Sequence, residues 1–97
     1  PTAIIASNDQ MAHGTLKVAA ELRLEVPRDL SLISFDNSPL VRFTHPPLTA
    51  IDQPVAETSS VAAELIIQAQ RGVDPPFEEV VVPAKLIERE SVAPPSI

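Results

Sequence analysis

The chain has 97 residues, 44% of them hydrophobic, and a formal net charge of −6. This length predicts one domain at most, or part of one, with a modest core. The seven Lys and Arg residues form no cluster, which excludes direct contact of this segment with nucleic acid. The sequence has no cysteine, which excludes disulfides, thiolate catalysis and cysteine metal sites.

The first half of the chain has the pattern strand, helix, strand. An apolar run predicts a strand at 3–6, and a second, clearer strand is predicted at 30–35. Between them, a helix is expected from a cap at Ser7 or Asn8 to an end near 22–23. A crossover of this length joins parallel strands in a right-handed sense. We therefore expect an α/β fold with a parallel sheet whose ligands bind at the carboxyl ends of these two strands.

Proline divides the second half of the chain into shorter elements. One helical turn is predicted at 40–43 and a strand at 48–51. Pro54 suits the first turn of a second helix, because its missing N–H has no partner to lose there. Gly72 is the expected stop of that helix.

The end of the chain contains two predicted strands, at 79–82 and 86–89, separated by Pro83. Proline is typical of edge strands and of breaks between sheets, so these two strands are expected either at a sheet edge or in different sheets. The tail at 92–97 is expected to be loosely held. The chain starts at Pro1, directly before a core strand, which suggests a cut in a larger protein.

The first predicted helix has a polar stripe formed by His13, Lys17 and Glu21 at i, i+4 spacing. Such a stripe is either a solvated face or part of an interface. Gly14 lies within the same helix, where glycine costs about 1 kcal/mol relative to alanine. That cost predicts close packing at Gly14.

Polar residues follow both strands of the first half. Asn8 and Asp9 stand where a helix begins, so capping alone explains them as well as ligand contact does. Asp36 ends an apolar strand, where a carboxylate is costly unless a partner pairs with it. Its alternative role is an Asx turn with Asn37. Gln53 precedes a proline and is either a polar hinge residue or a ligand contact.

The sequence has no catalytic or metal-binding pattern. His13 and His45 lack metal-ligand spacing, and no serine has a histidine and an acid at recognisable spacing. Two glycines cannot form a P-loop or a dinucleotide fingerprint. No cofactor, metal or catalytic residue is therefore predicted.

Four motifs, taken in order, resemble the carboxy-terminal portion of bacterial transcriptional regulators of the LacI/GalR family. They cover nearly the whole chain and are the segments 1–14, 26–37, 46–54 and 86–91. The resemblance implies about half of a two-lobed, periplasmic-binding-protein-like domain with Rossmann-like lobes.

This resemblance also implies how the chain divides between the two lobes. Residues 1–52 and 86–97 would form the C-terminal lobe, and residues 53–82 would return to the N-terminal lobe. The helix-turn-helix headpiece of the family, through which DNA is bound, would lie elsewhere.

The same resemblance implies three ligand-binding residues. Asn8 matches the asparagine of the Asn-Asp pair of the family, and Asp36 matches the first acid after the second strand. Gln53 matches a glutamine at the lobe crossing. Where the family often has a second acid, this chain has Asn37, which is expected to alter the ligand preference.

Regulators of this family dimerise partly through the first helix and the segment after the second strand. The matching interface residues here are His13, Lys17 and Glu21 on the helix, with Leu40 and Phe43 in the following segment. A homodimer is therefore expected, with a solvated helix face as the plain alternative.

The expected function is the effector-sensing portion of a LacI-type regulator in the cytoplasm, which binds a small polar ligand such as a sugar in a cleft between lobes. No membrane contact is expected, since no apolar run is long enough. A periplasmic solute-binding protein of the same fold is the alternative. A second alternative is an enzyme that uses Asp36 with His45, but the spacing of these two residues in the sequence does not support it.

Overall fold

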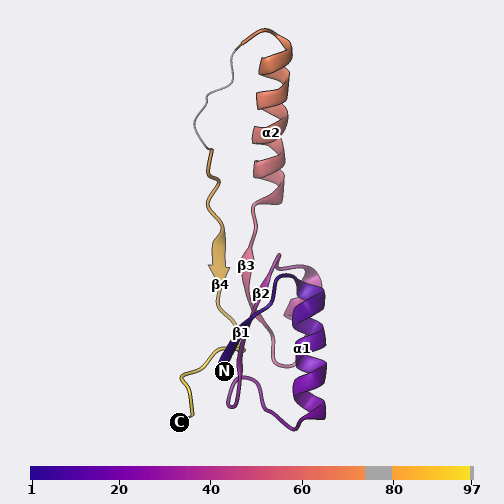
Figure 1. Ribbon diagram of the computed structural model, residues 1–97, viewed down its shortest axis with the longest axis vertical. Coiled ribbons are helices and arrows are strands. Elements are labelled where there is room, and N and C mark those ends of the chain that lie inside the picture. Colours follow the sequence, from indigo (N-terminus) through magenta and orange to yellow (C-terminus); the bar gives the residue numbers. More distant parts are fainter. Residues whose placement is uncertain (74–79, 97) are drawn as a thin grey trace. The chain divides into compact units, whose positions relative to one another are not determined.

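The computed structural model describes residues 1–73 and 80–96. Its elements in chain order are β1 (Ala3–Ile5), α1 (Asp9–Glu21), β2 (Ser31–Phe35), a 3₁₀ turn (Pro39–Arg42), β3 (Thr49–Asp52), α2 (Val55–Gln70) and β4 (Lys85–Ile87) (Figure 1). They form two compact units. Unit 1 comprises Pro1–Gln53 with Lys85–Ile97, and unit 2 comprises Pro54–Ala84.

Unit 1 is built on a sheet with the strand order β1-β2-β3-β4. β1 pairs with β2 and β2 with β3 in parallel, which confirms the predicted strand-helix-strand unit. β4 runs antiparallel to β3, with Ala50 opposite Ile87. The sheet is therefore mixed, because the last strand arrives from the opposite direction.

The core of unit 1 lies between α1 and one face of the sheet. Along β2, Leu32 and Ser34 point to this face, as the two-residue period of a strand requires. Leu32 is fully buried and packs with Ala12 of α1 and with Leu48 and Ala50 of the neighbouring strand region. Small residues on the helix thus bring it close to the sheet.

Helix α1 begins with a side-chain cap. The Met11 N–H donates to Asn8 Oδ1 at 2.8 Å, which satisfies one of the free donors of the first turn. The prediction of close packing at Gly14 is wrong, because a Cβ there would meet none of the described atoms within 4 Å. Gly14 lies on the outer side of the helix.

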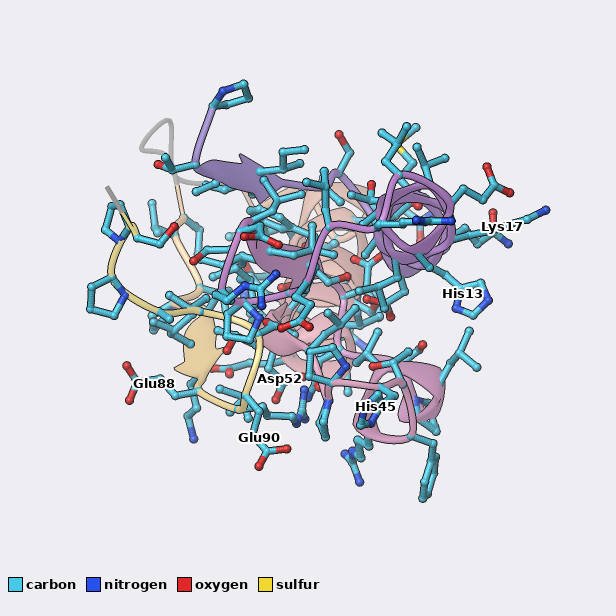
Figure 2. The ribbon with its side chains drawn as sticks, turned by 90° about the horizontal axis from the view of Figure 1, so that it is seen from below. His13, Lys17, His45, Asp52, Glu88 and Glu90 are labelled. Carbon is cyan, nitrogen blue, oxygen red and sulfur yellow. The ribbon has the colours of Figure 1, made fainter. Side chains whose placement is uncertain are left out.

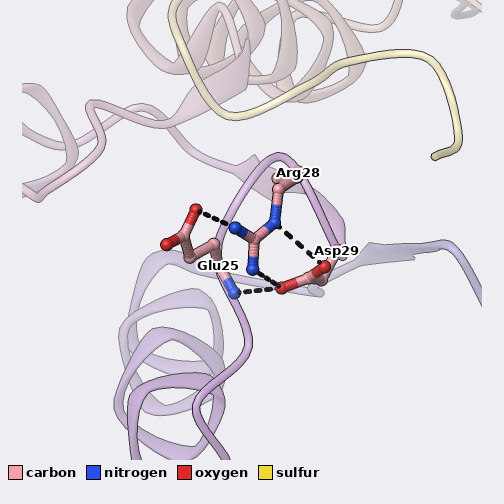
Figure 3. A network of polar contacts seen from close by, with 3 residues as sticks. All are labelled: Glu25, Arg28 and Asp29. Atoms are coloured by element: carbon pink, nitrogen blue, oxygen red, sulfur yellow. Dashed lines mark hydrogen bonds and ion pairs between the residues drawn. The ribbon is translucent and has the colours of Figure 1, made fainter.

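The turn between α1 and β2 is held by a polar network (Figure 3). Arg28 contacts Glu25 at 3.0 Å and Asp29 at 2.9 Å, and the Glu25 N–H donates to Asp29 Oδ2 at 2.8 Å. The hydrogen bonds and charge of Arg28 lower the pKa of the Asp29 carboxyl. This exposed network closes the connection that brings the chain to β2.

The segment after β4 differs from the sequence prediction. Ser91 is fully buried, and its hydroxyl accepts from the Thr49 N–H and donates to the Leu32 carbonyl. Ala93 exchanges two hydrogen bonds of 3.0 Å with the Ser31 hydroxyl. The expectation of a loose tail from 92 is therefore wrong as far as Ala93, because serine hydroxyls fix it to β2.

The strand predicted at 79–82 is absent from 80–82 in the described part of the chain, and Glu79 lies outside that part. The predicted strand at 86–89 is shifted to Lys85–Ile87.

Unit 2 contains α2, which follows Pro54 directly and ends before Gly72 as predicted. Gly72 has a φ of +78°, a left-handed conformation that favours glycine. No residue of α2 is buried against the part of the chain that the structure describes. No helix among these described residues has the length and apolar character needed to cross a membrane.

Candidate functional site

A recess lies at the carboxyl ends of β1 and β2, the edge at which parallel α/β sheets bind ligands. It has a volume of about 430 Å³, and its walls come from the start of α1 and from the turn after β2. The lining residues are Asn8, Asp9, Gln10, Asp36, Ser38 and Leu40. Asn8, Asp9 and Asp36, which the sequence places after two different strands, therefore meet at one recess of unit 1.

Asn8 is oriented by its role as the helix cap. Its side-chain oxygen accepts from the Met11 N–H, so the amide NH₂ group is left as the donor end of the side chain. Among the described residues this NH₂ group has no acceptor. Capping and ligand contact are thus compatible, because the Asn8 side-chain oxygen caps the helix while its NH₂ group can donate to a ligand.

Asp36 and Gln53 are brought together. Gln53 Nε2 donates to Asp36 Oδ1 at 2.8 Å, and the Asp36 side chain is exposed rather than buried. The second carboxylate oxygen of Asp36 accepts no hydrogen bond from the described residues. One amide therefore donates to this carboxylate, and its second oxygen remains as an acceptor for a ligand.

Asp9 has a structural role, because it is nearly buried and its carboxylate is held by hydrogen bonds. Only 6% of its surface is exposed; it accepts from the Ser34 hydroxyl and, at 2.6 Å, from the Ser38 N–H. Burial alone would raise the pKa of Asp9, but hydrogen bonds from Ser34 and Ser38 outweigh it, so the pKa lies below its usual value. Asp9 thus ties α1 to β2 and to the turn that carries Asp36.

Arg89 is a residue that the sequence analysis missed. Its guanidinium donates to Asn37 Oδ1 and to the Leu48 carbonyl, both at 2.6 Å. These partners lie 52 and 41 positions away in the chain, so no local pattern could reveal the contact. The isolated arginine among the last residues of the sequence gave no signal of its own.

The residues predicted at an interface are all exposed. His13 and Lys17 point outward from α1 (Figure 2), and Glu21 follows one turn further along the same helix. In the 3₁₀ turn and directly after it, Leu40 is 51% exposed and Phe43 85% exposed. α1 contacts this turn, so a polar stripe and two apolar side chains belong to neighbouring elements.

The structure does not bring together the groups needed for catalysis by Asp36 and His45. His45 lines another recess, of about 450 Å³, with Leu16 and Val26. No group of three His, Cys, Asp or Glu residues in the described part of the chain is arranged to hold a metal ion.

Comparison with known proteins gives the family. The profile of the periplasmic binding protein-like domain family matches residues 1–92. The transcriptional regulator MalR of Streptomyces coelicolor is 38% identical over 92 residues, which are 95% of this chain and 27% of MalR. A solved LacI family regulator from Bifidobacterium animalis superposes with a TM-score of 0.88 at 42% identity, over 98% of this chain and 35% of that one. This chain belongs to the LacI/GalR family, in its periplasmic-binding-protein-like domain.

Another solved LacI family regulator, from Enterococcus faecium, contains bound ribose; it has 32% identity, a TM-score of 0.77 and coverage of 96% of this chain and 35% of that one. The chain thus spans about a quarter to a third of the length of these relatives. The relatives named here are transcriptional regulators, which points to a regulatory rather than an enzymatic role for the LacI/GalR domain described here.

Proposed function

We propose that this chain is the effector-sensing part of a LacI-type transcriptional regulator and that Asn8, Asp36 and Gln53 bind a sugar or a sugar derivative. The observation that carries the proposal is the shared recess of Asn8 and Asp36 at the carboxyl edge of the sheet. The family supplies the regulatory context.

The polar groups at the recess suit neighbouring hydroxyls. The unpaired oxygen of Asp36 can accept one O–H, and the Asn8 NH₂ group can donate to the same hydroxyl or to the next. A hydroxyl both donates and accepts, so it matches this pair better than an anion does. Asp36 carries the negative charge here, which disfavours a phosphate or a carboxylate at this wall of the recess.

The proposed mechanism is a shift between two arrangements of the lobes. We assign residues 1–52 and 86–97 to the C-terminal lobe and 53–82 to the segment that returns to the N-terminal lobe. A ligand that contacts both lobes favours the arrangement in which these contacts coexist. The difference in ligand affinity between the two arrangements sets how far DNA binding by the full-length cytoplasmic protein can respond.

Calorimetry of the full-length protein with ribose, glucose, maltose and cellobiose tests the ligand class. We expect at least one of these sugars to bind, and Asp36→Ala to weaken it by roughly 10- to 100-fold, the usual effect of losing a hydrogen bond to a charged group. The matched control is Glu88→Gln, which removes an exposed charge outside the recess. Operator affinity should be unchanged in Asp36→Ala. Equal sugar affinity in the wild type and in Asp36→Ala would show that Asp36 does not bind the sugar.

We also propose that His13, Lys17, Glu21, Leu40 and Phe43 lie in a homodimer interface. The exposure of Leu40 and Phe43 supports this, because exposed apolar side chains that adjoin one another are typical of contact surfaces. Sedimentation of the full-length protein should give a dimer for the wild type and a lower association constant for Phe43→Glu. Unchanged association in Phe43→Glu and Lys17→Glu would contradict this interface.

A solute-binding protein exported to the periplasm is the alternative use of the fold. The regulators among the relatives favour the proposal over it. The sequence upstream of Pro1 in the full-length protein decides between them, since a helix-turn-helix segment supports a regulator and an export signal supports the alternative.

A further inference from the structure

The turn after β2 has an unusual backbone. Asp36 and Asn37 have φ values of +93° and +58°, a region that residues other than glycine rarely adopt. Asparagine tolerates this conformation better than most residues, whereas two such residues in succession require support from outside. Backbone of this kind gathers at ligand-binding turns, so the contacts that hold it matter for function.

Two backbone N–H groups of the turn donate to neighbouring elements, one to β3 and one to α1. The Asp36 N–H donates to the Ile51 carbonyl at 3.0 Å, and the Ser38 N–H donates to Asp9 Oδ2 at 2.6 Å. They fix the residues before and after Asn37. Asn37 accepts from Arg89 through its side chain at 2.6 Å, and its backbone N–H also contacts the Asp9 carboxylate.

Arg89 is well placed to hold the turn because it is itself anchored. Its backbone N–H donates to Thr49 Oγ1 at 3.0 Å, and its guanidinium reaches the Leu48 carbonyl while it reaches Asn37. The planar fork of arginine allows the two donations at once, which lysine cannot reproduce. The Arg89 side chain is half-buried, so its geometry is restrained by packing as well.

We propose that Arg89 is a positioning residue, which sets the direction of the Asp36 carboxylate by holding Asn37 in the left-handed turn. The proposal rests on the proposed role of Asp36 in ligand binding. The neutral oxygen of Asn37 accepts from Arg89 without placing a further negative charge beside Asp36.

Three substitutions separate positioning from general stability. Arg89→Lys keeps the charge but loses the fork, and Asn37→Gly removes the acceptor while it permits a positive φ. Asn37→Asp keeps the acceptor and supplies a counter-charge, so it should preserve the contact. Arg71→Lys, at the exposed end of α2, is the matched control for the arginine substitution.

The first measurement is hydrogen–deuterium exchange of the full-length protein without sugar. We expect the peptide that contains 36–38 to exchange roughly tenfold faster or more in Arg89→Lys and Asn37→Gly, as the loss of a charge-assisted hydrogen bond implies. The peptide of α1 should be unchanged, and Asn37→Asp should stay within about twofold of the wild type at 36–38. The double variant should equal the larger single effect, because both remove one contact.

Unchanged exchange at 36–38 in both single variants would overturn the proposal. So would an equal rise in all peptides, since that is the result of lower global stability alone. Calorimetry with ribose, glucose, maltose and cellobiose then separates this proposal from the one on which it rests. Faster exchange confined to 36–38 without sugar binding by the wild type supports positioning and contradicts the ligand class. Sugar binding that Arg89→Lys leaves unchanged contradicts positioning.

Discussion

The two α-helices among the described residues, α1 and α2, are of similar length but differ in what holds them. α1 (Asp9–Glu21) has a side-chain cap and buries Ala12 and Ala19 against the sheet. α2 (Val55–Gln70) follows Pro54, which offers no side-chain acceptor, and none of its residues is buried against the described part of the chain. Apolar side chains such as Ile66, which is 61% exposed, remain on its surface.

This difference shows that a helical pattern does not determine whether a helix contributes to a core. Isolated helices of this length are marginal in water, and packing of an apolar face supplies most of their stability. α1 obtains that packing within unit 1. The apolar residues of α2 stay exposed in the described part of the chain, and the proposed return of 53–82 to a second lobe predicts that they are covered in the full-length protein.

The largest expected effect comes from comparing a buried residue of unit 1 with an exposed residue of unit 2. Leu32→Ala should lower the free energy of unfolding of the 97-residue chain by about 3 kcal/mol, because it leaves a cavity among fully buried side chains. Ile66→Ala should change it by about 0.5 kcal/mol or less, as expected for a surface position. Urea titration followed by circular dichroism measures both. Similar losses in the two variants would mean that α2 packs as tightly as β2.

A smaller effect is expected at a buried hydroxyl. Ser91→Ala should cost about 2 kcal/mol, because the Thr49 N–H and the Leu32 carbonyl would each lose a partner in a buried place. Ser60→Ala in α2 is the matched control and should stay within about 0.5 kcal/mol, since alanine is the better helix former. The same urea titration applies. A neutral Ser91→Ala variant would show that water replaces the hydroxyl.

The regions around Leu32 and Ser91 also show what could be predicted from the sequence. The apolar run at 30–35 and the cap and stop signals at Asn8 and Gly72 are local, and they predicted the elements and the parallel pairing. The shared recess of Asn8 and Asp36 followed from the parallel pairing.

The contacts of Ser91 and Arg89 join segments more than 40 positions apart, and hydroxyls and guanidinium groups have no period in the sequence. The prediction of close packing at Gly14 was wrong because the cost of glycine in a helix can be read from the sequence, whereas the open space around Gly14 cannot. The roles of Asn8, Asp36 and Gln53 in ligand binding stay predictions.

A third comparison uses the acids in the first turns of the two helices. The pKa of Asp9 is lower in the folded protein than in the unfolded chain, so folding favours the ionised form. Its contribution is complete above a pH of about 4 and is lost as the pH falls through the lower folded-state pKa. Asp9→Asn should therefore cost about 1 to 2 kcal/mol at pH 7 and less at pH 2.5.

Glu57→Gln in the first turn of α2 is the control for Asp9, since Glu57 is exposed. Its effect on the free energy of unfolding should be within about 0.5 kcal/mol at both pH values. Urea midpoints at pH 7 and pH 2.5 give the comparison. A cost of Asp9→Asn that does not decrease at low pH would contradict the ionised hydrogen-bonded role of Asp9.

The smallest effects are expected at the two glycines, one in each unit. Gly14 lies inside α1 with open space around it, so Gly14→Ala should raise the free energy of unfolding by about 0.5 to 1 kcal/mol through higher helix propensity. Gly72 has a positive φ at the end of α2. Gly72→Ala should therefore lower the free energy of unfolding by about 1 kcal/mol through backbone strain. Thermal and urea unfolding of the 97-residue chain should shift in opposite directions in the two variants. If Gly14→Ala is destabilising in the full-length protein but stabilising in the 97-residue chain, another part of the protein packs against α1 at Gly14, and the outer side of this helix is as much a contact surface as the exposed side of α2.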